Sequence, residues 1–219
     1  RVRRGEAECI RSWSAGLSMK SNLRAVIYIP PDQLAFDKPE PSSSARNPAS
    51  LQAITDIRQL RAEDPFILIS RPGILGSSGD HKQRRRELEA RLVSSALDQI
   101  KKRYAINEWV LVGLSGGGHT VASLLGWRSD VVCAVAASAV SSPRMRWQLM
   151  GRDADLTGYT DSYEPVEHLQ PGNFKSGLRV FVLGDTRDSN VLWQTQIPLA
   201  TRLKKLGVAA ELLNGEGSD

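Results

Sequence analysis

The stretch WVLVGLSGGGHT, from Trp109 to Thr120, decides the fold of this chain. An apolar run typical of a buried strand breaks at Ser115, and three glycines follow before a helical pattern begins. Glycines at such a break can bind a phosphate, form a tight turn or hold up a nucleophile. The neighbouring residues decide between these uses.

Both phosphate-binding motifs lack a residue that they need. A Walker-type loop requires a lysine after its last glycine, but His119 follows Gly118 here. A dinucleotide-binding fingerprint requires a third glycine, and Val121 occupies that position. We therefore expect no nucleotide cofactor.

The motif G-x-S-x-G is complete, with Gly113, Ser115 and Gly117 between a predicted strand and a predicted helix. This motif forms a nucleophile elbow, in which backbones approach so closely that side chains two residues either side of the serine would clash. The bare motif is a weak signal, and its strand-turn-helix context strengthens it. We predict Ser115 as a nucleophile and the N–H of Gly116 as an oxyanion donor.

Short β-branched runs alternate with helical patterns, which predicts an α/β fold with a mostly parallel, doubly wound sheet and helices on both faces. We expect one domain over residues 1–219, in which 141–170 is a small excursion over the catalytic edge. The predicted strands are 24–30, 65–70, 109–112, 130–138, 177–185 and 208–214.

The longest predicted helix runs from about Gln83 to Tyr104. Its expected apolar stripe consists of Leu88, Leu92, Ala96 and Ile100, widened by Val93 and Leu97.

The chain has 219 residues, of which 41% are hydrophobic and 24% are charged, as in an ordinary soluble globular protein. The longest uncharged apolar run, Val131 to Val140, is about half as long as a membrane-spanning helix. We therefore expect no membrane span.

The formal charge is +5, and basic residues cluster at 1–4, 82–86 and 101–103. Acidic residues lie between the last two clusters, and no aromatic residues interleave with the basic ones to stack on bases. We interpret these clusters as solvated helix faces and expect no nucleic-acid partner.

The two cysteines, Cys9 and Cys133, cannot form a disulfide framework, and no His/Cys spacing indicates a metal site. Cys133 is expected to be a free thiol in a buried strand. The chain begins with Arg1 instead of methionine, which favours a processed, secreted or periplasmic protein.

The segment YEPVEHLQPGNFKSGLRVFVLGDTRDSNVLWQTQIPLATRLKKLG, residues 163–207, resembles the α/β-hydrolase superfamily. It is similar to the prolyl-oligopeptidase-like and dienelactone-hydrolase-like branches, and the resemblance extends from about Arg24 onward. By this resemblance Asp188 is the acid of a catalytic triad, and Asp185 caps the turn after a strand. The resemblance implies a cofactor-free, metal-free serine hydrolase that acts on a small ester or peptide substrate.

The catalytic base is expected outside this sequence. The family places its histidine after the last strand, which here leads into NGEGSD, so we expect the histidine shortly after Asp219. His119 is expected to point into helix packing, and His168 matches a structural position of the family. His81 follows a loop at the catalytic edge and is the weaker candidate.

The second oxyanion donor is expected from the loop after AVIYI, where the family often has His-Gly and this chain has Pro30, Pro31 and Asp32. Proline has no N–H, so Asp32 is the predicted donor, although its acidic side chain must point away. SRPGILGSSGD, from Ser70, resembles a D-x-R-G-x-G-x-S turn of the superfamily and is interpreted as a tight turn bordering the pocket.

Two function classes follow from these observations. A serine hydrolase is favoured by the complete elbow and by Asp188. A non-catalytic binding protein with a hydrolase fold is favoured by the unplaced histidine and by Pro30 and Pro31. We expect the enzyme.

Overall fold

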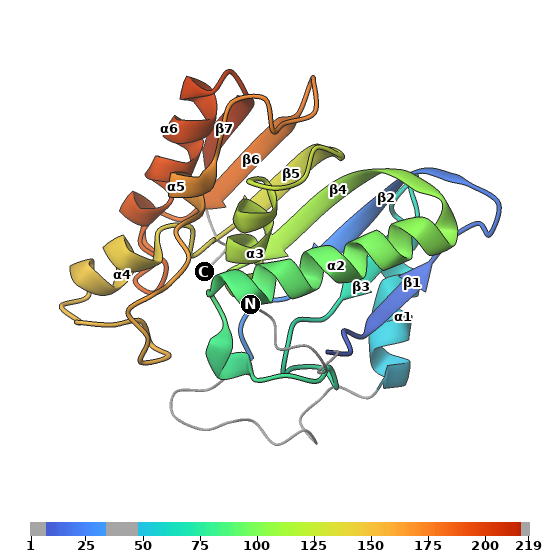
Figure 1. Cartoon of the computed structure of the whole chain (residues 1–219), viewed down its shortest axis with the longest axis horizontal. Coiled ribbons are helices and arrows are strands. Elements are labelled where there is room, and N and C mark those ends of the chain that lie inside the picture. Colours follow the sequence, from blue (N-terminus) through green and yellow to red (C-terminus); the bar gives the residue numbers. More distant parts are fainter. Residues whose placement is uncertain (1–7, 34–47, 216–219) are drawn as a thin grey trace.

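The computed structural model describes residues 8–33 and 48–215. Seven strands of this part form one sheet in the order β1-β3-β2-β4-β5-β6-β7 (Figure 1). β1 runs antiparallel to β3, and the other neighbouring strands run parallel. The strands are β1 (Ser12–Ala15), β2 (Asn22–Ile29), β3 (Phe66–Ile69), β4 (Ile106–Leu114), β5 (Val131–Ala137), β6 (Arg179–Gly184) and β7 (Ala209–Asn214).

Helices connect the parallel strands, as right-handed crossover units require. They are α1 (Pro48–Gln59), α2 (Glu87–Tyr104), α3 (Gly116–Leu124), α4 (Pro143–Leu149), α5 (Pro165–His168) and α6 (Ile197–Lys205). Two short 3₁₀ helices, η2 (His81–Gln83) and η3 (Trp193–Thr195), lie in the connections. The segment 141–170 carries α4 and α5, and Figure 1 shows α4 beyond the carboxyl ends of the strands.

All six predicted strands are confirmed, and the predicted α/β fold class is confirmed with them. β1 was not predicted, because its sequence SWSA has only one buried side chain, that of Trp13. Antiparallel pairing with β3 holds β1 in the sheet, with Ser12 opposite Ile69.

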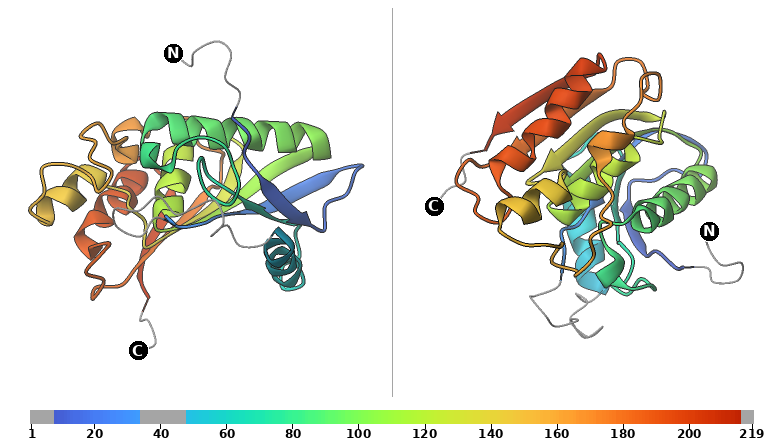
Figure 2. Two further views of the ribbon diagram at one scale, coloured as in Figure 1. Left: turned by 90° about the horizontal axis from the view of Figure 1, so that it is seen from below. Right: turned by 60° about the vertical axis from the view of Figure 1, so that its left-hand side comes forward.

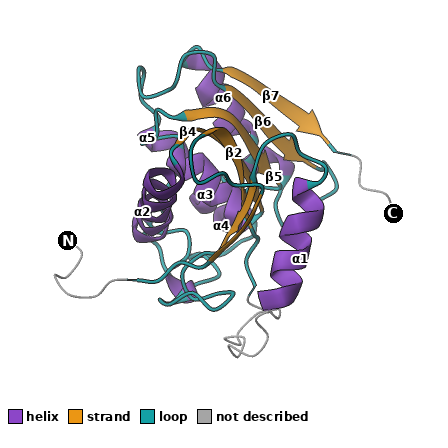
Figure 3. Cartoon of the chain, turned by 90° about the vertical axis from the view of Figure 1, so that its right-hand side faces the viewer, coloured by secondary structure: helices purple, strands orange, loops and turns teal. Residues whose placement is uncertain are grey.

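The sheet has helices on both faces, with α1 and α2 on opposite sides (Figures 2 and 3). The larger core lies on the α2 face, where α2, α3 and α6 bury side chains against strands β2 to β7. A smaller core holds Leu51 of α1 with Trp13, Leu68, Ile74 and Leu75. The carboxyl ends of the central strands are thus fixed between two packed layers.

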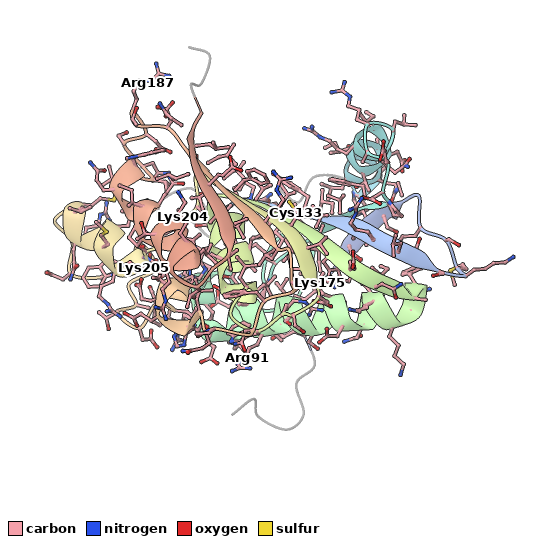
Figure 4. The ribbon with its side chains drawn as sticks, turned by 90° about the horizontal axis from the view of Figure 1, so that it is seen from above. Arg91, Cys133, Lys175, Arg187, Lys204 and Lys205 are labelled. Carbon is pink, nitrogen blue, oxygen red and sulfur yellow. The ribbon has the colours of Figure 1, made fainter. Side chains whose placement is uncertain are left out.

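The α1 face is covered unevenly. Val112, Val135 and Phe181 are consecutive register partners on this face, and all three are only half-buried. No helix of the described chain lies over β5 to β7 on this side, where Figure 4 labels Cys133. Cys133 is a free thiol as expected, but it is half-buried and not fully enclosed.

The buried side of α2 differs from the predicted stripe. Val93 and Leu97 are fully buried with Ala90, whereas Leu88 is 44% exposed. Glu89 is also buried, because its carboxylate accepts a hydrogen bond from Arg71 Nε at 2.9 Å. None of the described helices is both long and apolar enough to cross a membrane.

Candidate active site

Ser115 stands at the sharp turn between β4 and α3, with φ +54° and ψ −116°. A non-glycine residue with such a positive φ is strained and requires support from its surroundings. That support comes from the end of β5: the Ser115 N–H donates to Ala137 O at 2.8 Å, and the Val140 N–H donates to Ser115 O at 3.4 Å. The predicted strand-turn-helix is therefore present.

The glycines around Ser115 allow three backbones to meet. A Cβ on Gly113 would collide with the carbonyl oxygen of Gly117. A Cβ on Gly117 would collide with the carbonyl oxygen of Ile29, at the end of β2. Gly118 contacts the turn after β5, since a Cβ there would lie 2.6 Å from Ala139 Cβ. The glycines thus seat the elbow on the ends of both neighbouring strands.

Gly116 and Asp32, the two predicted oxyanion donors, lie side by side. Gly116 is the first residue of α3, where N–H groups have no acceptor within the helix. The Asp32 carboxylate does not point away from it, because a Cβ on Gly116 would collide with Asp32 Oδ1. The structure therefore places a negative charge beside the elbow, and not only a backbone N–H.

Three guanidinium groups neutralise this carboxylate. Arg71 Nη1 lies 2.8 Å from Asp32 Oδ1, Arg84 Nε lies 3.3 Å from Oδ2, and Arg85 Nη1 bonds Oδ2. Burial raises the pKa of Asp32, but Arg85, Arg71 and Arg84 lower it much further, so the net pKa is far below its usual range. Asp32 is therefore ionised at any working pH.

The arginine cluster, as we call Arg71, Arg84 and Arg85, is buried, with 0%, 8% and 1% exposure. The interpretation of 82–86 as a solvated helix face is therefore wrong for Arg84 and Arg85. Arg85 also pairs with Asp155 at 2.6 Å. The D-x-R-G motif does not point to Arg71, because with Ser70 at the position of the acid its arginine falls on Pro72.

Asp188 lies in the loop after β6. Its Oδ1 accepts the N–H groups of Asn190 and Val191 at 2.8 and 2.9 Å, while Oδ2 has no donor in the described chain. Asp185 caps the turn as predicted, since its Oδ1 accepts the Arg187 N–H at 2.8 Å. Asp188 thus has one oxygen fixed by the backbone and one available for another donor.

The three histidines have other partners. His119 Nε2 lies 2.9 Å from Tyr163 O, and burial lowers the pKa of His119 to about 4. His168 stacks on the Tyr163 ring with centroids 4.2 Å apart. His81 contacts Pro72 O through Nδ1 at 3.2 Å, and its Nε2 lies 3.7 Å from Asp32 Oδ1.

Within residues 8–33 and 48–215, none of these histidines forms a hydrogen bond with Ser115 or Asp188. The packing role expected for His119 is confirmed. The base expected after Asp219 lies outside the described residues.

The sequence matches no protein-family model and no curated protein. Its structure is similar to alpha/beta hydrolase domain-containing protein 10 from mouse, with 14% identity and a TM-score of 0.61 over 99% of this chain and 88% of that one. The chain has the α/β-hydrolase fold. The chain is also similar to one bacterial and one archaeal structure.

One is a lipase/esterase from Lactobacillus plantarum, with 13% identity and a TM-score of 0.64 over 98% of this chain and 87% of that chain. The other is the Pyrococcus furiosus esterase Pf2001, with 13% identity and a TM-score of 0.63 over 95% of this chain and 82% of that chain. At such identities the likeness establishes the fold of this chain, and its chemistry must be argued from its own residues.

In the described part of this chain, no group of three or more His, Cys, Asp or Glu side chains has a geometry that could hold a metal ion. The polar groups near the elbow are instead arranged as a serine, a backbone N–H and a network of ion pairs.

Proposed function

We propose that this α/β-hydrolase is a serine hydrolase that cleaves an ester or an amide bond through an acyl-enzyme on Ser115. The observation that carries the proposal is the backbone of Ser115, held at φ +54° on a strand-to-helix turn. Strain of this kind persists where the surroundings enforce it, and here it presents a nucleophilic side chain above the sheet. The esterases and lipase among the similar structures favour an ester substrate.

In the proposed reaction, Ser115 Oγ attacks the carbonyl carbon of the substrate while a base removes the hydroxyl proton. The carbonyl oxygen becomes an oxyanion, which the Gly116 N–H and the Asp32 N–H stabilise. The leaving group departs with the proton that the base returns. Water then attacks the acyl-enzyme by the same route, releasing the acid and regenerating Ser115.

We propose that Asp188 orients a histidine supplied by the chain that follows β7. The end of β7 lies beside the loop after β6 that carries Asp188, which we call the acid loop. The Thr186 N–H donates to Asn214 Oδ1 at 3.3 Å, and the Gly215 N–H donates to Gly184 O at 2.7 Å. Asp188 Oδ2 also lacks a donor in the described chain. The Asp188 motif further supports assignment to the prolyl-oligopeptidase-like or dienelactone-hydrolase-like branch.

Labelling with a fluorophosphonate tests this proposal. We expect the wild-type protein to gain one phosphonyl group on Ser115, located by peptide mass spectrometry, and Ser115→Ala to gain none. Asp188→Asn should react much more slowly, by a factor on the order of 10⁴ if the acid acts as in other triads. The variant Asp185→Asn, which removes a turn-capping carboxylate three residues before Asp188 and outside the proposed triad, should retain most of the rate.

The alternative is a non-catalytic binding protein with the same fold. The Asp32 carboxylate beside Gly116 favours it, since a fixed negative charge opposes a forming oxyanion. A wild-type protein that is labelled no faster than Ser115→Ala would contradict the enzyme proposal and select this alternative.

A further inference from the structure

Arg146, in α4, is only 3% exposed, yet it forms no ion pair with a carboxylate of the described chain. Its Nε and Nη2 donate to Asn190, to the backbone oxygen at 2.8 Å and to Oδ1 at 2.6 Å. Its Nη1 has no acceptor among the residues that the structure describes. A guanidinium enclosed without a counter-ion is unfavourable, because burial removes water that stabilises the charge.

Arg146 borders the proposed catalytic site. Asn190 lies two residues after Asp188, in the loop that follows β6. On the other side, α4 begins shortly after Val140, whose N–H donates to Ser115 O. The pKa of Arg146 is lowered by burial and then by the charge of Arg85, while Asp155 and Asp32 oppose this effect. Arg146 therefore shares one electrostatic environment with the carboxylate beside the elbow.

Arg146 stands outside the ion pairs that surround the elbow. The pKa of His81 is lowered to about 4, by burial first and then by Arg71, so this imidazole is neutral near pH 7. Three guanidinium groups, those of Arg71, Arg84 and Arg85, contact three carboxylates, those of Asp32, Glu89 and Asp155. Arg146 contacts none of these carboxylates, and its side-chain donors bond Asn190.

Unsatisfied polar atoms lie in the same place. Arg84 Nε is close enough to Asp32 for an ion pair but has no partner with hydrogen-bond geometry. His81 Nε2 is buried and has no hydrogen-bond partner either. Both atoms face Asp32, whose side chain is 22% exposed and is the solvent-accessible member of the network. Arg84 Nε is thus a donor without an acceptor, whereas neutral His81, whose Nδ1 faces the Pro72 carbonyl oxygen, has at Nε2 an acceptor without a donor.

We infer that the substrate of this hydrolase carries a carboxylate, and that Arg146 Nη1 binds it. The inference rests on the proposed function. A planar guanidinium matches the geometry of a carboxylate and donates charge-assisted hydrogen bonds to it. Arg146 is then a specificity-determining residue that selects anionic esters over neutral ones.

Matched ester pairs test this inference. The first pair is mono-4-nitrophenyl glutarate and its neutral methyl ester, which differ in the acyl part. The second is 4-carboxyphenyl butyrate and its methyl ester, which differ in the leaving group. We expect kcat/KM to favour the anionic member of one pair by about 10- to 100-fold, as for a hydrogen bond to a charged group.

Arg146→Met should abolish this preference, and Arg146→Lys should retain part of it. Arg144→Met is the matched control, because Arg144 lies on the same helix, is half-exposed and pairs with Glu167. It should keep the wild-type preference. An equal loss on charged and neutral esters in Arg146→Met would show that Arg146 only anchors the acid loop, and would overturn the inference.

Binding to Ser115→Ala separates this inference from the proposed function. Monomethyl glutarate should raise the Tm of Ser115→Ala, while neutral dimethyl glutarate should not, and the added Arg146→Met change should remove the effect. If Ser115 is labelled in the wild type, but monomethyl glutarate does not bind and neither ester pair shows a preference that depends on Arg146, the hydrolase stands and the carboxylate site is wrong. If the ligand binds but Ser115 is never labelled, the proposed function fails instead.

Discussion

Glu164, which precedes α5, is a buried carboxyl to which no cationic side chain of residues 8–33 and 48–215 is hydrogen-bonded. It is 7% exposed, and its Oε1 accepts the backbone N–H of Arg144 at 2.7 Å. Burial raises its pKa to about 7, Arg144 opposes the shift through its N–H and its charge, and Glu167 adds to it. The folded protein therefore favours the protonated form of this residue.

Stability should fall as the pH rises from the unfolded pKa of 4.5 to the folded value of about 7. In that window the unfolded chain has released the proton and the folded chain still holds it, so deprotonation favours unfolding. Glu164→Gln should remove this slope and exceed the wild type at pH 8 by roughly 1–3 kcal/mol. Urea denaturation at pH 4 and pH 8 measures it, and identical pH profiles would contradict it.

At the scale of single residues, the sequence could not show which arginines are buried. Arg84 and Arg85 stand in a run of polar and charged residues, and Arg71 opens the glycine- and serine-containing loop after an apolar strand. Their burial depends on carboxylates far away in the chain. Asp32 is 39 residues from Arg71, and Asp155 is 70 residues from Arg85. Such pairs leave no local pattern.

At the scale of elements, the nucleophile elbow is a junction of β4, α3 and the end of β2. The junction is closest at Gly117, where a Cβ would collide with Ile29 O and would lie 2.6 Å from Pro30 O. Both are backbone atoms, so a larger side chain can be accommodated only by moving the turn that carries Asp32.

Gly117→Ala should therefore lower the free energy of unfolding by about 1–3 kcal/mol, as overpacking does, and should slow fluorophosphonate labelling of Ser115. Gly126→Ala is the matched control, because its Cβ would lie 3.3 Å from the nearest atom, His168 O. Chemical denaturation compares the two variants. If the two variants lost similar amounts of unfolding free energy, the close contact between Gly117 and the end of β2 would not restrict the size of the side chain at position 117.

Element prediction succeeded where an element has its own apolar pattern and failed where a partner defines it. The runs that form β2 to β7 are apolar and flanked by turn residues, so each is visible locally. β1 is visible only through its pairing with β3. The buried side of α2 shifted from Leu88 toward Glu89, because Arg71 supplies the ion-pair partner that makes burial of a carboxylate favourable.

For the whole molecule, the two faces of the sheet differ in how they are buried. Leu111 belongs to the α2 face and is 0% exposed. Leu183 belongs to the α1 face at β6, where no described helix covers it, and is half-buried. Parallel sheets normally have both faces covered. Because this sheet is covered unevenly, truncating a side chain should cost more unfolding free energy on the α2 face than on the α1 face at β6.

Leu111→Ala should lower the free energy of unfolding by about 2–5 kcal/mol, because it leaves a cavity in a closed core. Leu183→Ala should lose less than about half as much, since solvent already reaches part of that side chain. Guanidinium denaturation of the two variants measures the difference. Equal losses would mean that the α1 face over β5 to β7 is as well covered as the α2 face.

The sequence by itself determined the strands of the parallel sheet, the G-x-S-x-G elbow and the turn that carries Asp188. These features depend on residues within about ten positions of one another, and local apolar patterns and glycine spacing encode them. Only the tertiary structure decided that Asp32 faces Gly116, that the arginine cluster is buried and that Arg146 lies beside the acid loop. Those arrangements join residues far apart in the chain, whose charges become favourable inside the protein only when folding brings opposite charges together.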